Sequence, residues 1–134
     1  MVATLISKIL TAVALGLLLT SAMADEPQWT SQRGLFAVSY RSELQPIQIN
    51  ELHSWVLHIT NAAGNPVVGA TIEANGGMPA HNHGLPTRPR VTEELGGGDY
   101  RLDGLRFHMS GQWEITLRIS ANGESDTVVI ALTL

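Results

Sequence analysis

The fold follows from one stretch, Trp113-Glu114-Ile115-Thr116-Leu117-Arg118-Ile119-Ser120, in which apolar and polar side chains alternate strictly. This alternation predicts a half-buried β-strand, because successive side chains of a strand point to opposite faces. The dipeptide Asn122-Gly123 follows and favours the tight turn of a β-hairpin. Residues 126–134 then predict the returning strand. The C-terminal part of the chain is therefore expected to form one antiparallel hairpin.

Strand patterns recur upstream of this hairpin. The other segments with strand character are 34–41, 52–60, 67–74, 87–95 and 100–109. In 67–74 we expect Val68, Ala70 and Ile72 to face the core, and Pro89 places 87–95 at a sheet edge. No window outside the N-terminal region has the 3.6-residue apolar period of an amphipathic helix. Together these segments predict an all-β protein, an antiparallel β-sandwich of about seven strands.

The N-terminal segment, 1–24, has the layout of a secretory signal peptide. Lys8 precedes an apolar run, and Ala22-Met23-Ala24 is an A-x-A cleavage site. The run is shorter than the about 20 residues that a membrane-spanning helix needs. We therefore expect a signal-peptide helix cleaved after Ala24, an exported periplasmic protein and no stable membrane insertion after cleavage. Retention as an anchor is the alternative. The mature chain would comprise a flexible N-terminal arm, 25–33, and one sandwich domain, 34–134.

The charges of the mature chain exclude some partners. Removing Lys8 leaves seven basic residues, all arginines, against 12 acidic ones, which gives a formal net charge of −5. This balance provides no basic surface for nucleic acid or for an anionic membrane. The chain also has no cysteine. The core must therefore hold the fold without disulfides, and no thiolate is available as a nucleophile or a metal ligand.

Two short clusters concentrate side chains that bind metals. His81 and His83 lie in a glycine- and proline-rich loop that follows Met78, and His108-Met109 form the second cluster. Imidazole nitrogen binds copper, zinc and nickel, whereas thioether sulfur favours Cu(I). The two methionines of the mature chain both fall in these clusters. We therefore predict a copper site, for Cu(I), Cu(II) or both, whose ligands are His81, His83, His108, Met109 and Met78.

A hairpin should bring the two clusters together. Gly96-Gly97-Gly98-Asp99 predicts a turn between the segments 87–95 and 100–109. Pairing about Gly97 opposes residues whose numbers sum to about 194, so that His108 would lie opposite Pro86. His83 is then only a few residues from His108 across the hairpin.

Other interpretations of these residues are open. An H-x-H motif in a glycine-rich loop is also typical of a solvated turn. Met109 shares strand parity with Leu105 and Phe107 and could face the core, and Met78 could fill space beneath the loop. The remaining histidines, His53 and His58, lie on opposite faces of one predicted strand, and we interpret both as structural.

The alternative function is a non-enzymatic interaction module without metal. An enzyme is disfavoured. A blue-copper centre requires a cysteine ligand, and a Cu/Zn superoxide dismutase-like sandwich needs more histidines and a bridging aspartate. We therefore expect a binding protein whose partners are a metal ion and a protein that accepts copper.

The chain resembles the YtkA-like domain family, a relative of the FixH-type proteins. The resemblance covers residues 32–134 and rests on two groups of motifs: Met78-Pro79-Ala80-His81-Asn82-His83-Gly84 with Pro86-Thr87 and Pro89-Arg90-Val91, and Gly98-Asp99-Tyr100 with Phe107-His108-Met109, Gly111 and Trp113-Glu114-Ile115. It implies an exported or membrane-anchored, immunoglobulin-like β-sandwich. It also implies a role in copper handling as a metallochaperone, for example in cytochrome oxidase assembly.

Overall fold

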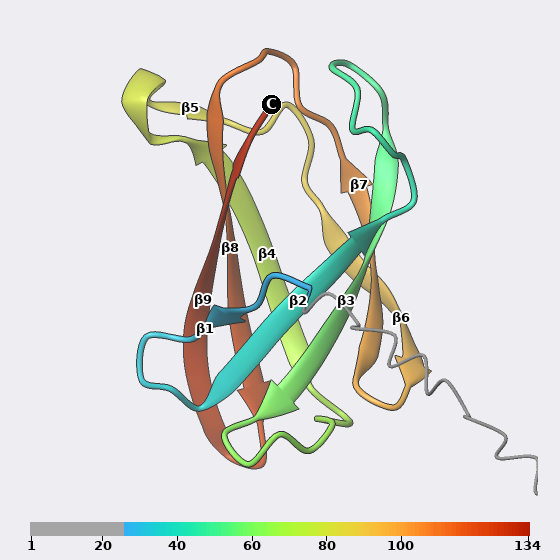
Figure 1. Cartoon of the computed structure of the whole chain (residues 1–134), viewed down its shortest axis with the longest axis vertical. Coiled ribbons are helices and arrows are strands. Elements are labelled where there is room, and N and C mark those ends of the chain that lie inside the picture. The colour runs from blue at the N-terminus through green and yellow to red at the C-terminus, as the bar shows by residue number, and fades with distance from the viewer. Residues whose placement is uncertain (1–25) are drawn as a thin grey trace, which may run out of the picture.

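The computed structural model describes residues 26–134, which form a sandwich of two antiparallel sheets (Figure 1). The five-stranded sheet has the order β1-β2-β3-β7-β6, and the four-stranded sheet has the order β5-β4-β8-β9. The strands of the first sheet are β1 (Trp29–Thr30), β2 (Phe36–Ser42), β3 (His53–Asn61), β7 (Asp99–Leu105) and β6 (Arg90–Gly96). Those of the second are β5 (His83–Gly84), β4 (Thr71–Met78), β8 (Gln112–Ala121) and β9 (Glu124–Thr133). The predicted all-β sandwich is confirmed.

The core fills the space between the two sheets. Strand β8 supplies Trp113, Ile115, Leu117 and Ile119, none of them more than 1% exposed, while the intervening residues face outward. Strand β3 supplies Trp55, Leu57 and Ile59 from the opposite sheet. The strict alternation in the sequence therefore corresponds to the two faces of a sheet with one face buried.

Two predictions about the strand edges need correction. Residues 25–33 are not a flexible arm throughout, because Trp29 and Thr30 pair with β2, and the Trp29 ring stacks on Tyr40 with ring centres 5.5 Å apart. In the segment 67–74, Val68 faces solvent and is 62% exposed, whereas Val67 is buried. Regular pairing begins only at Thr71, so the period of two does not extend back to Val68.

The N-terminal turn is fixed by one buried carboxylate. Asp126 on β9 accepts hydrogen bonds from the backbone N–H groups of Arg33 (2.9 Å) and Leu35 (3.4 Å). Nearby, the N–H of Gln32 donates to the carbonyl of Thr127 (2.9 Å). These bonds join the start of the first sheet to the last strand of the second.

The predicted signal peptide, 1–24, lies outside the described residues. Within residues 26–134, no helix is long and apolar enough to cross a bilayer.

Candidate functional site

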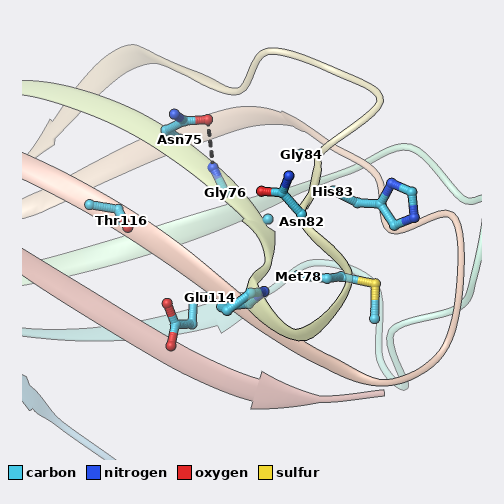
Figure 2. A pocket seen from close by; sticks show the side chains of 10 residues that line it. Asn75, Gly76, Met78, Asn82, His83, Gly84, Glu114 and Thr116 are labelled. Atoms are coloured by element: carbon cyan, nitrogen blue, oxygen red, sulfur yellow. Dashed lines mark hydrogen bonds between the residues drawn. The ribbon is translucent and has the colours of Figure 1, made fainter.

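The loop with the two histidines folds back onto its own strand. β4 ends at Met78, a single 3₁₀ turn (η1, Pro79–His81) follows, and β5 returns beside β4 (Figure 2). Asn82 makes the reversal with φ 51° and ψ 37°, a left-handed conformation that asparagine tolerates better than most residues. The return pairs Gly77 with Gly84 and Met78 with His83.

The three predicted histidines come together. The ring centres of His81 and His83 are 6.2 Å apart, and those of His83 and His108 are 6.1 Å apart. His81 and His83 are exposed, and His108 is half-buried. His83 therefore neighbours a histidine of its own loop and one from a distant segment.

The β6–β7 hairpin delivers His108 as its turn predicts. Arg90 pairs with Asp103 and Glu94 with Tyr100, so the opposed numbers sum to 193 and 194. Strand β7 ends at Leu105, earlier than expected, and the chain continues without pairing toward His108. The N–H of Asn50 donates to the carbonyl of Phe107 (2.8 Å) and holds this extension in place.

Trp113 orients the second cluster from below. Its ring lies edge-on to His108 with centres 5.4 Å apart, and edge-on to Phe107 at 5.2 Å. The indole N–H donates a hydrogen bond to the carbonyl of Met109 (3.0 Å). The sequence places Trp113 on the apolar face of a strand and within the family motif, but gives it no role at the site. Trp113 has the inward-facing parity of its strand and follows Met109 by only four residues. These two features together could have predicted that it lies beneath the site.

The methionines lie deeper than the histidines. Met78 is 1% exposed, and its side chain fills the space beneath the loop, with its Cε next to Gly111. Met109 is half-buried and packs against the core. Both methionines are thus less exposed than His81 and His83, and only Met78 is fully buried.

The spacing of the rings approaches what one shared metal requires. A metal–nitrogen bond is about 2.0–2.1 Å and a ring nitrogen lies about 1.1 Å from the ring centre. The ring centres of two imidazoles on one tetrahedral ion are therefore about 5.2 Å apart, and reach about 6.4 Å only if the two ligands lie on opposite sides of the ion. Both observed separations are longer than the tetrahedral value by about 1 Å. Among residues 26–134, no three histidine or carboxylate groups are already arranged to hold an ion. Closing the site needs rotation of the exposed rings, a motion of picoseconds to nanoseconds.

His108 has one nitrogen that the rest of the protein does not use. Its Nδ1 is buried and has no hydrogen-bond partner within the described residues. Metal-binding histidines usually donate their second ring N–H to an acceptor, which fixes the ring. Here the aromatic contact with Trp113 orients the ring instead.

His53 and His58 stay outside the cluster. His53 is 7% exposed, and its Nδ1 lies 3.0 Å from the carbonyl of Glu51. His58 Nδ1 lies 2.6 Å from Asp99 Oδ1 on the outer face of the five-stranded sheet. The placement of these two residues fits their interpretation as structural.

A hollow of about 290 Å³ adjoins the loop (Figure 2). His83 and Asn82 line one side of it, and Glu114 of β8 lines the other. Gly77 lies between them in register with Glu114, and its lack of a side chain opens the hollow. His81 and His108 do not line it. The hollow is therefore a neighbour of the histidine cluster rather than its interior.

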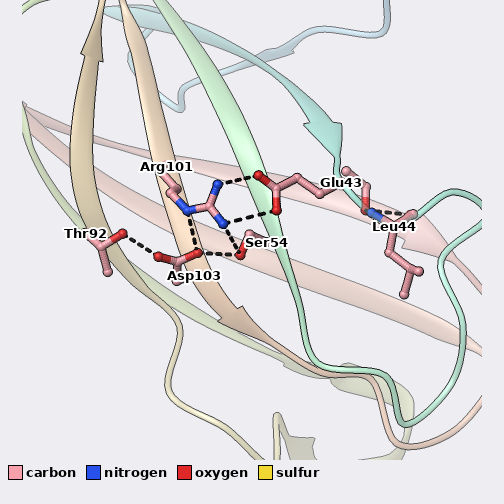
Figure 3. Close-up of polar contacts among 7 residues, drawn as sticks. Glu43, Leu44, Ser54, Thr92, Arg101 and Asp103 are labelled. Carbon is pink, nitrogen blue, oxygen red and sulfur yellow. Dashed lines mark hydrogen bonds and ion pairs between the residues drawn. The ribbon is translucent and has the colours of Figure 1, made fainter.

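A polar network ties the five-stranded sheet together on its outer face (Figure 3). Arg101 forms ion pairs with Glu43 and with Asp103, whose Oδ1 is 2.9 Å from Arg101 Nε. Hydrogen bonds from the Ser54 and Thr92 hydroxyls, with the positive charge of Arg101, lower the pKa of the Asp103 carboxyl. None of the residues of the histidine cluster takes part in this network.

The fold and the loop define a small antiparallel β-sandwich with a histidine cluster at one end. A family model described as YtkA-like matches residues 36–118, and the chain belongs to this family. No curated protein matches the chain. Among solved structures, the chain is similar to one described as the ZirS C-terminal domain, with 15% sequence identity and a TM-score of 0.44. That match covers 100% of this chain and 88% of the other.

Proposed function

We propose that this YtkA-like protein is a non-enzymatic copper-binding protein of the periplasm, a metallochaperone or copper-handling factor. One observation carries the proposal: the His83 ring neighbours both His81 and His108, with ring centres 6.2 Å and 6.1 Å away. The histidines come from two segments that the fold brings together, which a merely solvated loop would not require.

The chemistry of the available ligands favours copper. The chain has no cysteine, so a thiolate zinc site and a blue-copper centre are both excluded. Imidazole binds Cu(II) and Cu(I), and a thioether adds preference for Cu(I). Met109 is the better thioether candidate because it is half-buried beside His108, whereas Met78 is 1% exposed and fills the core. Met78 would reach the ion only if the loop moved.

Exposure of the loop suits a carrier. His81 and His83 are open to solvent, so a second protein could approach the metal and take it over ligand by ligand. A site that delivers its ion must be accessible, whereas a purely structural site is closed. This supports transfer to an acceptor protein, for example during cytochrome oxidase assembly, the role that the family resemblance implies.

The direct test is metal titration of the purified protein. Cu(II) and Cu(I) affinities would be measured by competition with chromophoric chelators, for the wild type and for His81→Ala, His83→Ala and His108→Ala. Each variant should bind at least about tenfold more weakly, because a ligand is lost. His58→Ala is the matched control, since His58 lies on a different face, and it should bind like the wild type. Unchanged affinity in both His81→Ala and His108→Ala would exclude the assigned site.

The methionines need a separate comparison. Met109→Leu keeps the apolar volume but removes the sulfur. It should weaken Cu(I) binding and leave Cu(II) binding nearly unchanged, because thioether sulfur prefers the softer ion. Met78→Leu should change stability more than affinity. The reverse result would make Met78 the sulfur ligand.

The alternative function, a metal-free interaction module, predicts a different thermal response. A ligand that binds only the folded state stabilises it by about 2.7 kcal/mol at a concentration 100 times the Kd. Copper at that concentration should therefore raise the melting temperature of the wild type more than that of His108→Ala, because a site that binds about tenfold more weakly gains only about 1.4 kcal/mol. No rise in either protein would favour the metal-free module.

Export is tested by the mature N-terminus. Protein recovered from a periplasmic fraction should begin at Asp25 if cleavage follows Ala24. An intact Met1 in a membrane fraction would show instead that the segment is kept as an anchor.

A further inference from the structure

A groove of about 710 Å³ lies between β4, at the edge of one sheet, and the segment that leads into β6, at the edge of the other. One wall is the β4 backbone at 72–75, and the other is the segment 87–91 that leads into β6. We refer to this as the β4 edge groove. It is separate from the histidine cluster, since none of its lining residues is a histidine.

The β4 wall offers free backbone hydrogen-bonding groups. β5 covers the β4 edge only at Gly77 and Met78, and the N–H of Leu85 donates to the carbonyl of Gly76 (3.0 Å). Because backbone groups of a strand alternate in direction, those of Ile72 and Ala74 point to the same open side as Gly76. Within residues 26–134 they have no backbone partner there. β5 therefore covers the edge of β4 at Gly77 and Met78 and leaves the edge open at residues 71–75.

This edge lacks the usual protection. Sheet edges are commonly shielded by proline, lysine or a covering loop. The facing segment has such residues, with a buried Pro89 between two exposed arginines. Residues 71–75 of β4 contain neither proline nor a basic residue. The edge that could accept a strand is thus the β4 edge.

The opposite wall is positively charged. Arg88 and Arg90 are exposed, lie two residues apart and line the groove. Neither forms an ion pair within the described part of the chain. Arg90 lies opposite Asp103, but that carboxylate already accepts from three other groups, the side chains of Ser54, Thr92 and Arg101. Glu73 also lines the groove, and its side chain is on the exposed face of β4, in register with Arg118.

We propose that the β4 edge groove binds an extended acidic peptide segment of a partner protein, which adds to β4 as a strand. Its backbone would bond to Ile72 and Ala74, and its carboxylates would meet Arg88 and Arg90. Strand addition draws affinity from main-chain hydrogen bonds and specificity from alternate side chains. With a rise of about 3.3 Å per residue, the open edge fits a core of four or five residues.

The groove leads toward the histidine cluster. Asn75 lines both the β4 edge groove and the hollow beside His83. A peptide held on β4 would therefore end close to the loop of His81 and His83. Peptide binding does not require copper, however, because the contacts are made by the β4 backbone and by Arg88 and Arg90, none of which is a proposed metal ligand.

The probe is a fluorescein-labelled, acetylated and amidated peptide, Thr-Glu-Val-Glu-Val-Glu-Thr, titrated into the protein in EDTA and followed by fluorescence anisotropy. The same peptide with glutamine for glutamate is its neutral counterpart. The acidic peptide should bind saturably and at least about fivefold more tightly than the neutral one, although the protein has net negative charge. Equal binding of the two, or none, would overturn the proposal.

Three variants separate the contributions. The double variant Arg88→Glu/Arg90→Glu should weaken acidic-peptide binding by at least about fivefold. Ala74→Pro removes an N–H from the open edge, where proline is tolerated, and should abolish strand addition. Arg41→Glu, at an exposed position on β2 outside the groove, controls for charge reversal elsewhere on the surface and should leave binding unchanged. Thermal melting would establish that each variant is folded.

Hydrogen exchange distinguishes strand addition from simple charge attraction. On peptide binding, the amides of Ile72 and Ala74 should exchange at least about tenfold more slowly, because they become hydrogen-bonded. Binding that depends on Arg88 and Arg90 but leaves these two amides unprotected would refute strand addition.

Discussion

The carbonyl oxygen of His83 lies so close to Gly77 that a β-carbon at position 77 would overlap it. This contact sets how tightly β5 closes onto β4, and it couples the sheet to the histidine loop. Only glycine permits the approach.

Gly77→Ala should therefore push β5 away and lower the free energy of unfolding by about 1–3 kcal/mol, as overpacking does. It should also weaken copper binding, since His83 moves with β5. Gly84→Ala is the matched control, because a β-carbon there meets only the carbonyl of Gly76 at 3.8 Å, an ordinary contact. Urea denaturation and copper titration of both variants are the measurements. Equal effects in the two would show that the close approach is unimportant.

Trp113 should matter for the site as well as for the core. Trp113→Phe keeps an aromatic ring but removes the N–H that bonds to the Met109 carbonyl (3.0 Å). We expect a loss of about 1–3 kcal/mol in unfolding free energy, because the Met109 carbonyl loses its hydrogen bond and the smaller ring leaves a cavity in the core. Copper affinity should also fall, since this hydrogen bond holds the His108-Met109 segment in place. A stability loss without any change in affinity would mean that Trp113 serves the core alone.

The Asp103 network should make stability depend on pH. Hydrogen bonds from Ser54 and Thr92, and the charge of Arg101, hold the pKa of Asp103 below its ordinary value. Its stabilisation is therefore complete above the unfolded value of about 3.9 and is lost as the pH falls through the lower folded value. Asp103→Asn should be less stable than the wild type at pH 7, and the gap should narrow below about pH 4. Urea midpoints between pH 7 and pH 2.5 would measure this, and a constant gap would contradict it.

Tyr100 anchors the chain before β4. Its hydroxyl donates to the carbonyl of Val67 (2.7 Å) and accepts from the N–H of Ala70 (3.1 Å), and the side chain is 1% exposed. Tyr100→Phe leaves both backbone groups unpaired and should cost about 1–3 kcal/mol. Amide exchange at Ala70 should accelerate in the variant. An unchanged exchange rate would show that water replaces the hydroxyl at no cost.

Most of the sandwich can be predicted from the sequence because apolar and polar residues alternate regularly along its strands. The β8–β9 hairpin follows from Trp113 to Ile119 and from the turn at Asn122-Gly123, where both residues have positive φ. The β6–β7 register is also predictable, since three glycines leave few ways to place the turn. Its sums vary between 193 and 195 because the pairing contains β-bulges, which no periodic pattern reveals.

The site is predictable only in part. The proximity of His83 and His108 is predictable because the position of the glycine turn determines which residues face each other across the hairpin. The depth of Met78 does not follow, because it depends on a neighbouring segment: its Cε packs against Gly111, far along the chain. The two-residue strand β5 is too short to have any period of its own, and Val68 lies just before pairing begins.

Within residues 26–134, the histidine loop leads from β4 into β5, which is the edge strand of its sheet. Insertions or deletions at such an edge leave the packed layers untouched, so evolution can alter the loop without rebuilding the domain. Within this family, the length of the loop between the fourth and sixth strands should therefore vary, whereas the core positions should keep apolar residues. One stable scaffold could in this way present different metal-binding loops.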